Sequence, residues 1–149
     1  GRSFSYDFVA ARLRDVFLDH NIHVLGFDRY NMRFLKPELS RAGFTDYQLE
    51  THFQDFGEGF VSMSPAIREL ESLLLQGKIR HGNHPVLTMC AANATIVTDP
   101  AENRKFTKQK ASGRIDGMEA LAMAIGVAMT RQNDSDQLTQ FLESVVRLG

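Results

Sequence analysis

The sequence predicts an α/β fold with a parallel component in its sheet. Two observations support this class: apolar residues recur at helical spacing in several segments, and short apolar runs separate these segments. The predicted order is helix, strand, helix, strand, helix, a mixed region and then two helices. With 149 residues, of which 43% are hydrophobic and 23% are charged, the chain has the size and composition of one globular domain.

Composition excludes several classes of protein. The formal net charge is −1, so any signal for nucleic-acid binding must be local. The single cysteine, Cys90, excludes a disulfide framework and a cysteine-rich zinc site, and it is typical of a reducing compartment. No apolar run approaches the roughly 20 residues that span a bilayer, and no signal peptide follows Gly1, so we expect no membrane partner. The chain opens on a helix and has few strands for a full sheet, so we expect a piece of a longer protein.

The first part of the chain predicts a helix followed by a buried strand. Residues 6–17 have one apolar face at helical spacing, with Ser5 as the N-cap. Residues 23–28 form a short, almost continuously apolar run that ends in Asp28, which predicts a strand buried on both faces of a mainly parallel sheet. Asp28 would then lie at the carboxyl end of the strand, the edge at which open α/β sheets bind ligands.

The next elements are a helix, a strand and a further helix. The helix is expected over residues 30–42, with Gly43 ending it and Pro37 either kinking it or dividing it into two short helices. Residues 47–53 alternate weakly and predict the strand. The Ser64-Pro65 pair is typical of an N-cap and a first helical position. The later expected elements are a helix over 85–92, strands over 95–98 and around Phe106, a helix over 117–130, a break at 132–134 and a last amphipathic helix from Ser135.

Two acids stand at the ends of regular elements: Asp28 after a strand, and Asp116 where a basic loop meets a helix. Two-metal phosphoryl transfer requires clustered carboxylates, because two divalent cations about 4 Å apart must be neutralised and held. Mg²⁺ and Mn²⁺ prefer oxygen ligands. The structural alternative is that Asp28 starts a turn and Asp116 caps its helix, and spacing alone favours this alternative. Glu119, one turn after Asp116, is a further candidate ligand, although a solvated helix residue is the simpler expectation.

A basic strip leads directly into Asp116. Cations beside a carboxylate site would hold a phosphate backbone near the metal ions, whereas a solvated hairpin explains the same strip equally well. His81 and His84 lack a third close ligand, so an exposed loop is favoured over a zinc site. The sequence contains no GxxxxGK[ST] phosphate loop and no GxSxG motif. The strip consists of Arg104, Lys105, Lys108, Lys110 and Arg114.

Two segments carry a resemblance to a known family. They are Arg114 to Ala124 (RIDGMEALAMA) and Leu25 to Asn31 (LGFDRYN). The first resembles the C-terminal signature of bacteriophage terminase large subunits, and the second resembles the strand and acid segment of the same family. The resemblance covers about residues 4–130, with its pieces in register. Further matches in the same order are Tyr6-Asp7, Gly77-Lys78-Ile79, His84-Pro85-Val86-Leu87, Ala92-Asn93 and Lys108.

The resemblance implies an RNase H-like nuclease fold with a mixed, partly parallel sheet flanked by helices, lacking its first strands in this chain. The nuclease domain would span residues 1–131, and residues 132–149 would form an amphipathic helix packed on it or used for a partner contact. Asp28 and Asp116 match two of the three metal-binding acids of the family, which would hold two Mg²⁺ or Mn²⁺ ions. The third acid, on the first strand of the fold, has no match in this sequence. The residues expected to bind DNA are Lys105, Lys108, Lys110 and Arg114.

The implied function is the nuclease part of a DNA-packaging terminase, which cuts concatemeric double-stranded DNA by two-metal-ion hydrolysis in the cytoplasm of the bacterial host. The implied partners are double-stranded DNA, a small terminase subunit, a portal protein and an ATPase domain upstream in the same chain. Without the third acid, this piece is expected to be weakly active or inactive by itself. Two alternatives stay open: another RNase H-like nuclease, of resolvase or transposase type, and a non-catalytic module that docks on DNA or the portal.

Overall fold

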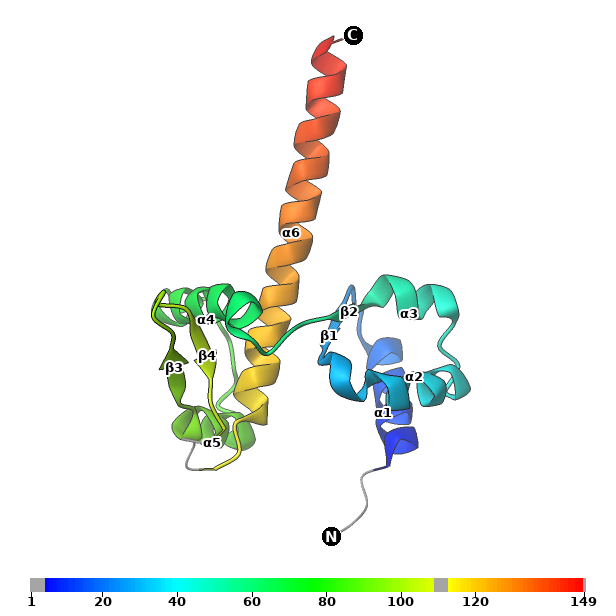
Figure 1. The fold of residues 1–149 in the computed structure, drawn as a ribbon. Helices are drawn as coiled ribbons and strands as arrows, with labels where there is room; N and C mark the ends of the chain where they lie inside the picture. The colour runs from blue at the N-terminus through cyan, green and yellow to red at the C-terminus, as the bar shows by residue number, and fades with distance from the viewer. Residues whose placement is uncertain (1–4, 109–112, 149) are drawn as a thin grey trace. The chain divides into compact units, whose positions relative to one another are not determined.

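The computed structural model describes residues 5–108 and 113–148, with side chains described as far as residue 140. The chain divides into two compact units, Gly1–Gly57 and Glu58–Gly149, and each is described by itself (Figure 1). Both units mix helices with a small two-stranded sheet, which confirms the α/β class. Within the described residues, no helix is long and apolar enough to cross a membrane.

The first unit is built on a parallel pair of strands. Strand β1 (Leu25–Phe27) pairs with β2 (Phe53–Asp55), with Leu25 opposite Phe53 and Phe27 opposite Asp55 (Figure 1). The expected parallel component is therefore present, although β1 is only partly buried rather than buried on both faces. The helices of this unit are α1 (Tyr6–Asp19), α2 (Arg29–Arg41) and α3 (Asp46–His52).

An aromatic cluster joins the helices of the first unit to β2. Phe44 and Phe53 are buried, and their rings meet edge to face at 5.5 Å between centroids. Phe17 of α1 stacks on Phe53 at 5.5 Å and meets Phe44 edge to face at 5.1 Å. Ala10 and Leu39 are completely buried in the same core. Such aromatic pairs add about 0.5–1.5 kcal/mol beyond the area they bury, so they fix how α1 packs beside β2.

Helix α2 ends at a glycine, as its sequence predicts. Gly43 has a φ of 101°, a left-handed conformation that favours glycine. The Phe44 amide donates to the Leu39 carbonyl at 3.0 Å, and the Gly43 amide donates to Ser40 at 3.0 Å, which together form a Schellman motif. Of the two outcomes expected at Pro37, a division into two helices is excluded, because α2 is one helix with Pro37 inside it. Burial of Leu39 after the proline holds the last turn in place.

The expected strand over residues 47–53 is also wrong, because all but its last residue belong to α3. Thr45 and Gln48 form a capping box at the start of this helix. The Gln48 amide donates to the Thr45 hydroxyl at 3.2 Å, and the Thr45 amide donates to the Gln48 side-chain carbonyl at 2.9 Å. Two N–H groups that would otherwise lack an acceptor are satisfied in this way. This stabilisation of the helix start outweighs the weak alternation of apolar and polar residues in the segment.

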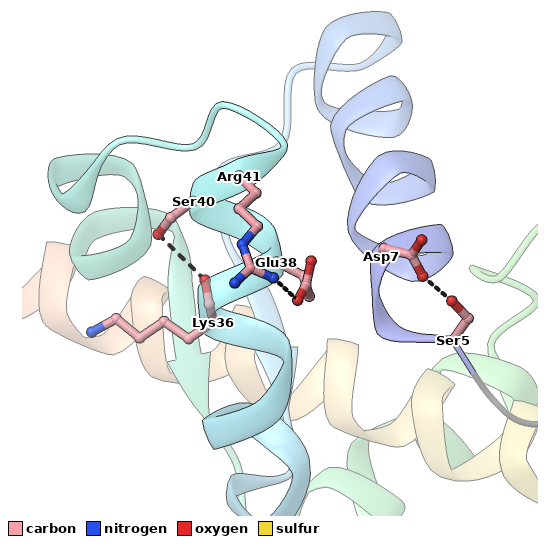
Figure 2. A network of polar contacts seen from close by, with 6 residues as sticks. All are labelled: Ser5, Asp7, Lys36, Glu38, Ser40 and Arg41. Carbon is pink, nitrogen blue, oxygen red and sulfur yellow. Dashed lines mark hydrogen bonds and ion pairs between the residues drawn. The ribbon is translucent and has the colours of Figure 1, made fainter.

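Ser5 occupies the N-cap position of α1, as expected, but its hydroxyl does not cap the helix. It donates instead to the carboxylate of Asp7 in the first turn (Figure 2). On α2, the Arg41 guanidinium pairs with Glu38, and the Ser40 hydroxyl donates to the Lys36 carbonyl at 3.3 Å. These contacts connect residues two to four apart, so they support the helices locally and not the packing between them.

In the second unit two helices pack against one long helix, and a hairpin packs against one of the two. Strands β3 (Ile96–Thr98) and β4 (Arg104–Phe106) pair antiparallel, with Ile96 opposite Phe106, as the strand and turn pattern predicts. Helix α6 (Asp116–Leu148) contacts both α4 (Phe60–Leu75) and α5 (Pro85–Asn93), and α4 also contacts β4 (Figure 1).

Two expected helix boundaries in this unit are wrong. Helix α4 starts at Phe60 rather than at Ser64, and Pro65 lies inside it. Ser64 is buried, so tertiary packing has drawn the preceding turn into the helix. The break expected at residues 132–134 is absent, because α6 continues through them. No Gly or Pro interrupts this stretch, and the low propensity of Asn and Asp is too small to stop a helix already formed. A partner contact for residues 132–149 stays a prediction.

Candidate functional site

Asp28 lies between β1 and α2, in the first unit. It is the N-cap residue of α2 and has an extended backbone, yet its side chain makes no capping hydrogen bond. Its carboxylate is exposed at the carboxyl end of the parallel strands, as the sequence predicts. Asp55 ends the neighbouring strand at this same edge and pairs with Arg29. Asp28 therefore keeps its carboxylate oxygens available for a ligand, whereas Asp55 is engaged by a cation.

Asp116 is the first residue of α6, in the second unit. The helix starts from the buried Ile115, whose carbonyl accepts the amides of Met118 at 2.9 Å and Glu119 at 3.1 Å. Asp116 therefore lies inside the first turn rather than in the N-cap position. A negative charge there is favoured by the helix dipole. Its side chain is exposed, so it can face a ligand while it stabilises the helix start.

Glu119 differs most from expectation, because it is buried and not solvated. Its side chain is 9% exposed, and its carboxylate accepts from the Lys108 ammonium at 3.0 Å. The Glu58 carboxylate lies 3.9 Å from the same ammonium. The sequence shows that Glu119 lies one helical turn after Asp116, a spacing that suits a shared metal site. The fold adds that Lys108, which follows the hairpin, contacts Glu119.

The three acids around Lys108 change its titration. The hydrogen bond from Lys108 to Glu119 raises the pKa of the lysine, and partial burial opposes this rise. The negative charges of Glu119, Glu58 and Asp116 raise the pKa further. Lys108 is therefore firmly protonated at neutral pH. The charge of Asp116 contributes to the raised pKa of Lys108, so these two predicted site residues interact electrostatically.

An open cavity of about 540 Å³ lies over this cluster. Lys105 contributes to its wall, with its ammonium 4.8 Å from the centre of the Phe60 ring. Such a cation–π contact restrains a long side chain that would otherwise be mobile. The charged side chains in the wall are two cations and two acids, so the cavity can take a ligand that carries both phosphate and bound cations. The charged lining residues are Glu58, Lys105, Lys108 and Glu119.

Among the described residues of the basic strip, Arg104 and Arg114 do not line this cavity. Arg104 pairs with Glu71 of α4 at 2.9 Å, so its charge is used within the unit. Arg114 is exposed, and its carbonyl accepts from the Asn93 side chain at 3.3 Å. Lys110 lies outside the described residues. The structure thus brings Lys105 and Lys108 together, with Asp116 near Lys108.

The donor set fits a hard divalent cation in part. Asp28 and Asp116 each present an exposed carboxylate, the ligand type that Mg²⁺ and Mn²⁺ prefer. Over the described residues, however, no group of three or more His, Cys, Asp and Glu side chains is arranged to hold a metal ion. Each unit therefore supplies acids suited to a metal ion without forming a complete site from its own side chains.

These features define a small α/β domain with free acids at helix starts and a cavity lined by lysines and acids. Residues 7–132 match the family model described as terminase large subunit, endonuclease domain. The chain belongs to this family, which confirms the resemblance seen in its sequence.

Two curated relatives are similar to the chain. It is 44% identical over 128 residues to the terminase large subunit of Enterobacteria phage HK97, a match covering 86% of this chain and 24% of that protein. It is 34% identical over 89 residues to the protein YmfN of Escherichia coli strain K12, covering 58% of this chain and 19% of that protein. The chain thus spans about a quarter or less of the length of these relatives.

A solved structure agrees with the sequence matches. The crystal structure of the HK97 bacteriophage large terminase superposes with a TM-score of 0.77 at 43% sequence identity. The match covers 85% of this chain and 26% of that one. At this identity the likeness extends beyond the general fold to the family.

Proposed function

We propose that this chain is the DNA-cutting part of a phage or prophage packaging terminase, and that it acts as a metal-dependent endonuclease on concatemeric double-stranded DNA. The observation that carries the proposal is the lysine-lined cavity near Asp116 in a chain that belongs to the terminase endonuclease family. An RNase H-like arrangement of the intact domain is part of the same proposal.

Asp28 and Asp116 are the proposed metal ligands, together with a further acid from a longer chain. Both carboxylates are exposed, and Asp28 is not used as a helix cap. Two bound Mg²⁺ or Mn²⁺ ions would supply an activated water molecule and stabilise the leaving 3′ oxygen during phosphodiester hydrolysis. The protein's own contribution is to hold both acids at the starts of helices, α2 and α6.

The lysines have a separate task, which is to hold the DNA backbone. Lys108 is kept protonated by Glu119 and Glu58, and Lys105 is restrained over Phe60. Two fixed ammonium groups can neutralise a phosphate and orient it without the entropic cost of ordering free side chains. Lys110 and Arg114 would extend this contact along the strand. Glu119 is then a positioning residue that acts through Lys108.

The wider partners are proposed on the family alone. They are double-stranded DNA, a small terminase subunit, a portal protein and an ATPase domain in the same longer chain, acting in the bacterial cytoplasm. The alternative function, a non-catalytic module that docks on DNA or the portal, is favoured by one observation. That observation is the lack, among the described residues, of a complete three-ligand metal site.

A nicking assay tests the proposal. Supercoiled plasmid is incubated with Mn²⁺ and either the 149-residue chain or a longer protein that contains it. Asp116→Ala in the longer protein should abolish cleavage while leaving its circular dichroism spectrum unchanged. Asp136→Ala, an exposed acid farther along α6, is the matched control and should cleave normally.

Two results would overturn the proposal. The first is undiminished Mn²⁺-dependent nicking by Asp116→Ala. The second is a longer protein that binds DNA without nicking it and shows no carboxylate-dependent Mn²⁺ binding by calorimetry, which is the behaviour of a docking module.

A further inference from the structure

The solvent-facing side of α2, in the first unit, carries two neighbouring stripes of side chains. The cation stripe consists of Arg29, Arg33 and Lys36. At i, i+4 and i+7 these residues share one line along the helix, about 10 Å long at about 1.5 Å per residue. The aromatic stripe, Tyr30 and Phe34, runs beside it with the same i, i+4 spacing. The other side of α2 packs into the core of the unit.

The aromatic stripe is exposed and is held in place by stacking. Tyr30 is 70% exposed and Phe34 is 48% exposed. The Arg33 guanidinium lies over both rings, 4.6 Å from the centre of Phe34 and 5.6 Å from that of Tyr30. The ring of Tyr6, from α1, supports Phe34 at 5.8 Å. Large rings held open to water with an arginine across them are typical of a recognition surface and not of a core.

The cation stripe carries positive charge that is mostly uncompensated. No acid occurs between Arg29 and Pro37, and in the part of the chain that the structure describes neither Arg33 nor Lys36 forms an ion pair. The Lys36 side chain extends away from the nearby Glu38–Arg41 pair (Figure 2). Such a surface attracts a polyanion.

We propose that this surface binds a single-stranded segment of DNA, with bases stacked on Tyr30 and Phe34 and phosphates held by Arg33 and Lys36. Exposed rings can stack only on bases that have left the duplex, whereas cations bind the backbone of either form. Arginine and tyrosine are also common in protein interfaces. Arg29 pairs with Asp55, but Arg33 and Lys36 form no ion pair among the described residues, and these two cations favour a nucleic acid over a protein. The choice of DNA rests on the proposed function, and α2 begins directly after Asp28, so a strand held here would run close to that acid.

Fluorescence anisotropy tests this surface without cleavage. The 149-residue chain is titrated in EDTA against a labelled oligothymidine and against a duplex of equal length. Tyr30→Ala and Phe34→Ala should each weaken single-strand binding about tenfold and duplex binding much less, because stacking on the rings is lost. Arg33→Ala removes a phosphate contact as well and should weaken the binding of both forms. The matched controls are Phe8→Ala and Arg12→Ala, an exposed aromatic and an exposed cation spaced i, i+4 on α1, and they should bind as the wild type does.

Three outcomes would overturn the inference. Unchanged single-strand affinity in all three variants removes the surface from DNA binding. Equal losses for single strand and duplex in Tyr30→Ala and Phe34→Ala reduce it to a general electrostatic contact. Unchanged affinity with a shift in oligomeric state by light scattering identifies a protein contact instead. The nicking assay separates this inference from the nuclease proposal. Ring-dependent binding in EDTA without nicking would remove only the nuclease, and nicking with unaltered single-strand binding would remove only this surface.

Discussion

The Lys108 ammonium lies 3.0 Å from a Glu119 carboxylate that α6 keeps almost completely out of water. The lysine itself is 59% exposed, so the pair joins a buried acid to a cation that still reaches the cavity. A buried carboxylate without a partner is costly, whereas an exposed lysine loses little when left alone. The arrangement therefore fixes the lysine at the cavity wall, and Glu119 depends on Lys108 more than Lys108 depends on Glu119.

Replacing each member of the pair in turn tests whether Glu119 depends on Lys108 more than the reverse. Lys108→Ala should destabilise the second unit by about 1–3 kcal/mol, because it leaves the buried carboxylate unpaired. Glu119→Gln should cost less, about 1 kcal/mol, because the amide is neutral and keeps a carbonyl acceptor. Urea denaturation of both variants measures the difference, with the exposed Glu50→Ala as the control. A larger loss for Glu119→Gln than for Lys108→Ala would contradict the argument.

The titration of Lys108 gives a second prediction. Its pKa is raised in the folded protein, chiefly by the hydrogen bond to Glu119. A raised pKa means that the pair contributes its full stability below the pKa of the unfolded chain, near 10.5, and loses it as pH rises through the folded value. Stability should therefore hold through neutral pH and fall only above about pH 10.5. NMR titration of the lysine side chain should show Lys108 deprotonating above 10.5, and Glu119→Gln should lower that value. An unaltered midpoint in Glu119→Gln would exclude the hydrogen bond as the cause.

Local signals predicted the elements that depend on local chemistry. The sequence predicts Gly43 as the end of α2, and this glycine has a left-handed φ of 101°. Gly77, with a φ of 65°, follows the end of α4 in the same way. The strands over 95–98 and around Phe106 are also predicted, because the residues between them are typical of a turn. The Thr45 and Gln48 capping box is a local signal for α3, and it outweighs the weak alternation that predicts a strand.

Other features depend on packing that no single segment reveals. The position of Glu119 in its helix predicts a solvated side chain. It is buried instead, and Lys108, which follows the hairpin, pairs with it on α6. The early start of α4 results from burial of Ser64 against its neighbours. Asp28 and Asp116 were singled out by position, and both are exposed at helix starts, but their joint role as metal ligands stays a prediction.

Gly43 should be difficult to replace. Its φ is 101°, and a Cβ atom there would come within 2.9 Å of the Arg14 guanidinium, which itself donates to the Ala42 carbonyl. Gly43→Ala should therefore destabilise the protein by about 1–2 kcal/mol. Gly59→Ala is the matched control, because its φ is −76° and nothing lies within 4 Å of the added carbon. Thermal unfolding followed by circular dichroism measures both, and an equal shift for the two variants would refute the role of the Schellman motif.

Asp28→Asn tests whether the negative charge of Asp28 binds a metal ion, because asparagine removes the charge and can still cap the helix. Asparagine and aspartate are about equally good N-cap residues, and Asp28 makes no capping hydrogen bond to lose. Asp28→Asn should therefore change the free energy of unfolding by less than about 0.5 kcal/mol. In the longer protein it should weaken Mn²⁺ binding and lower the nicking rate at least a hundredfold, because a neutral amide cannot neutralise a divalent cation.

The matched control for Asp28→Asn is Asp46→Asn, in which the acid is exposed in the first turn of α3. It carries the same change of charge at a comparable helix position, and it should leave both Mn²⁺ binding and nicking unaltered. Calorimetry with Mn²⁺ and the plasmid assay are run on the same samples as the denaturation curves. If Asp28→Asn unfolds the first unit, Asp28 is a structural cap. If it is stable and nicks at the wild-type rate, Asp28 is not a metal ligand.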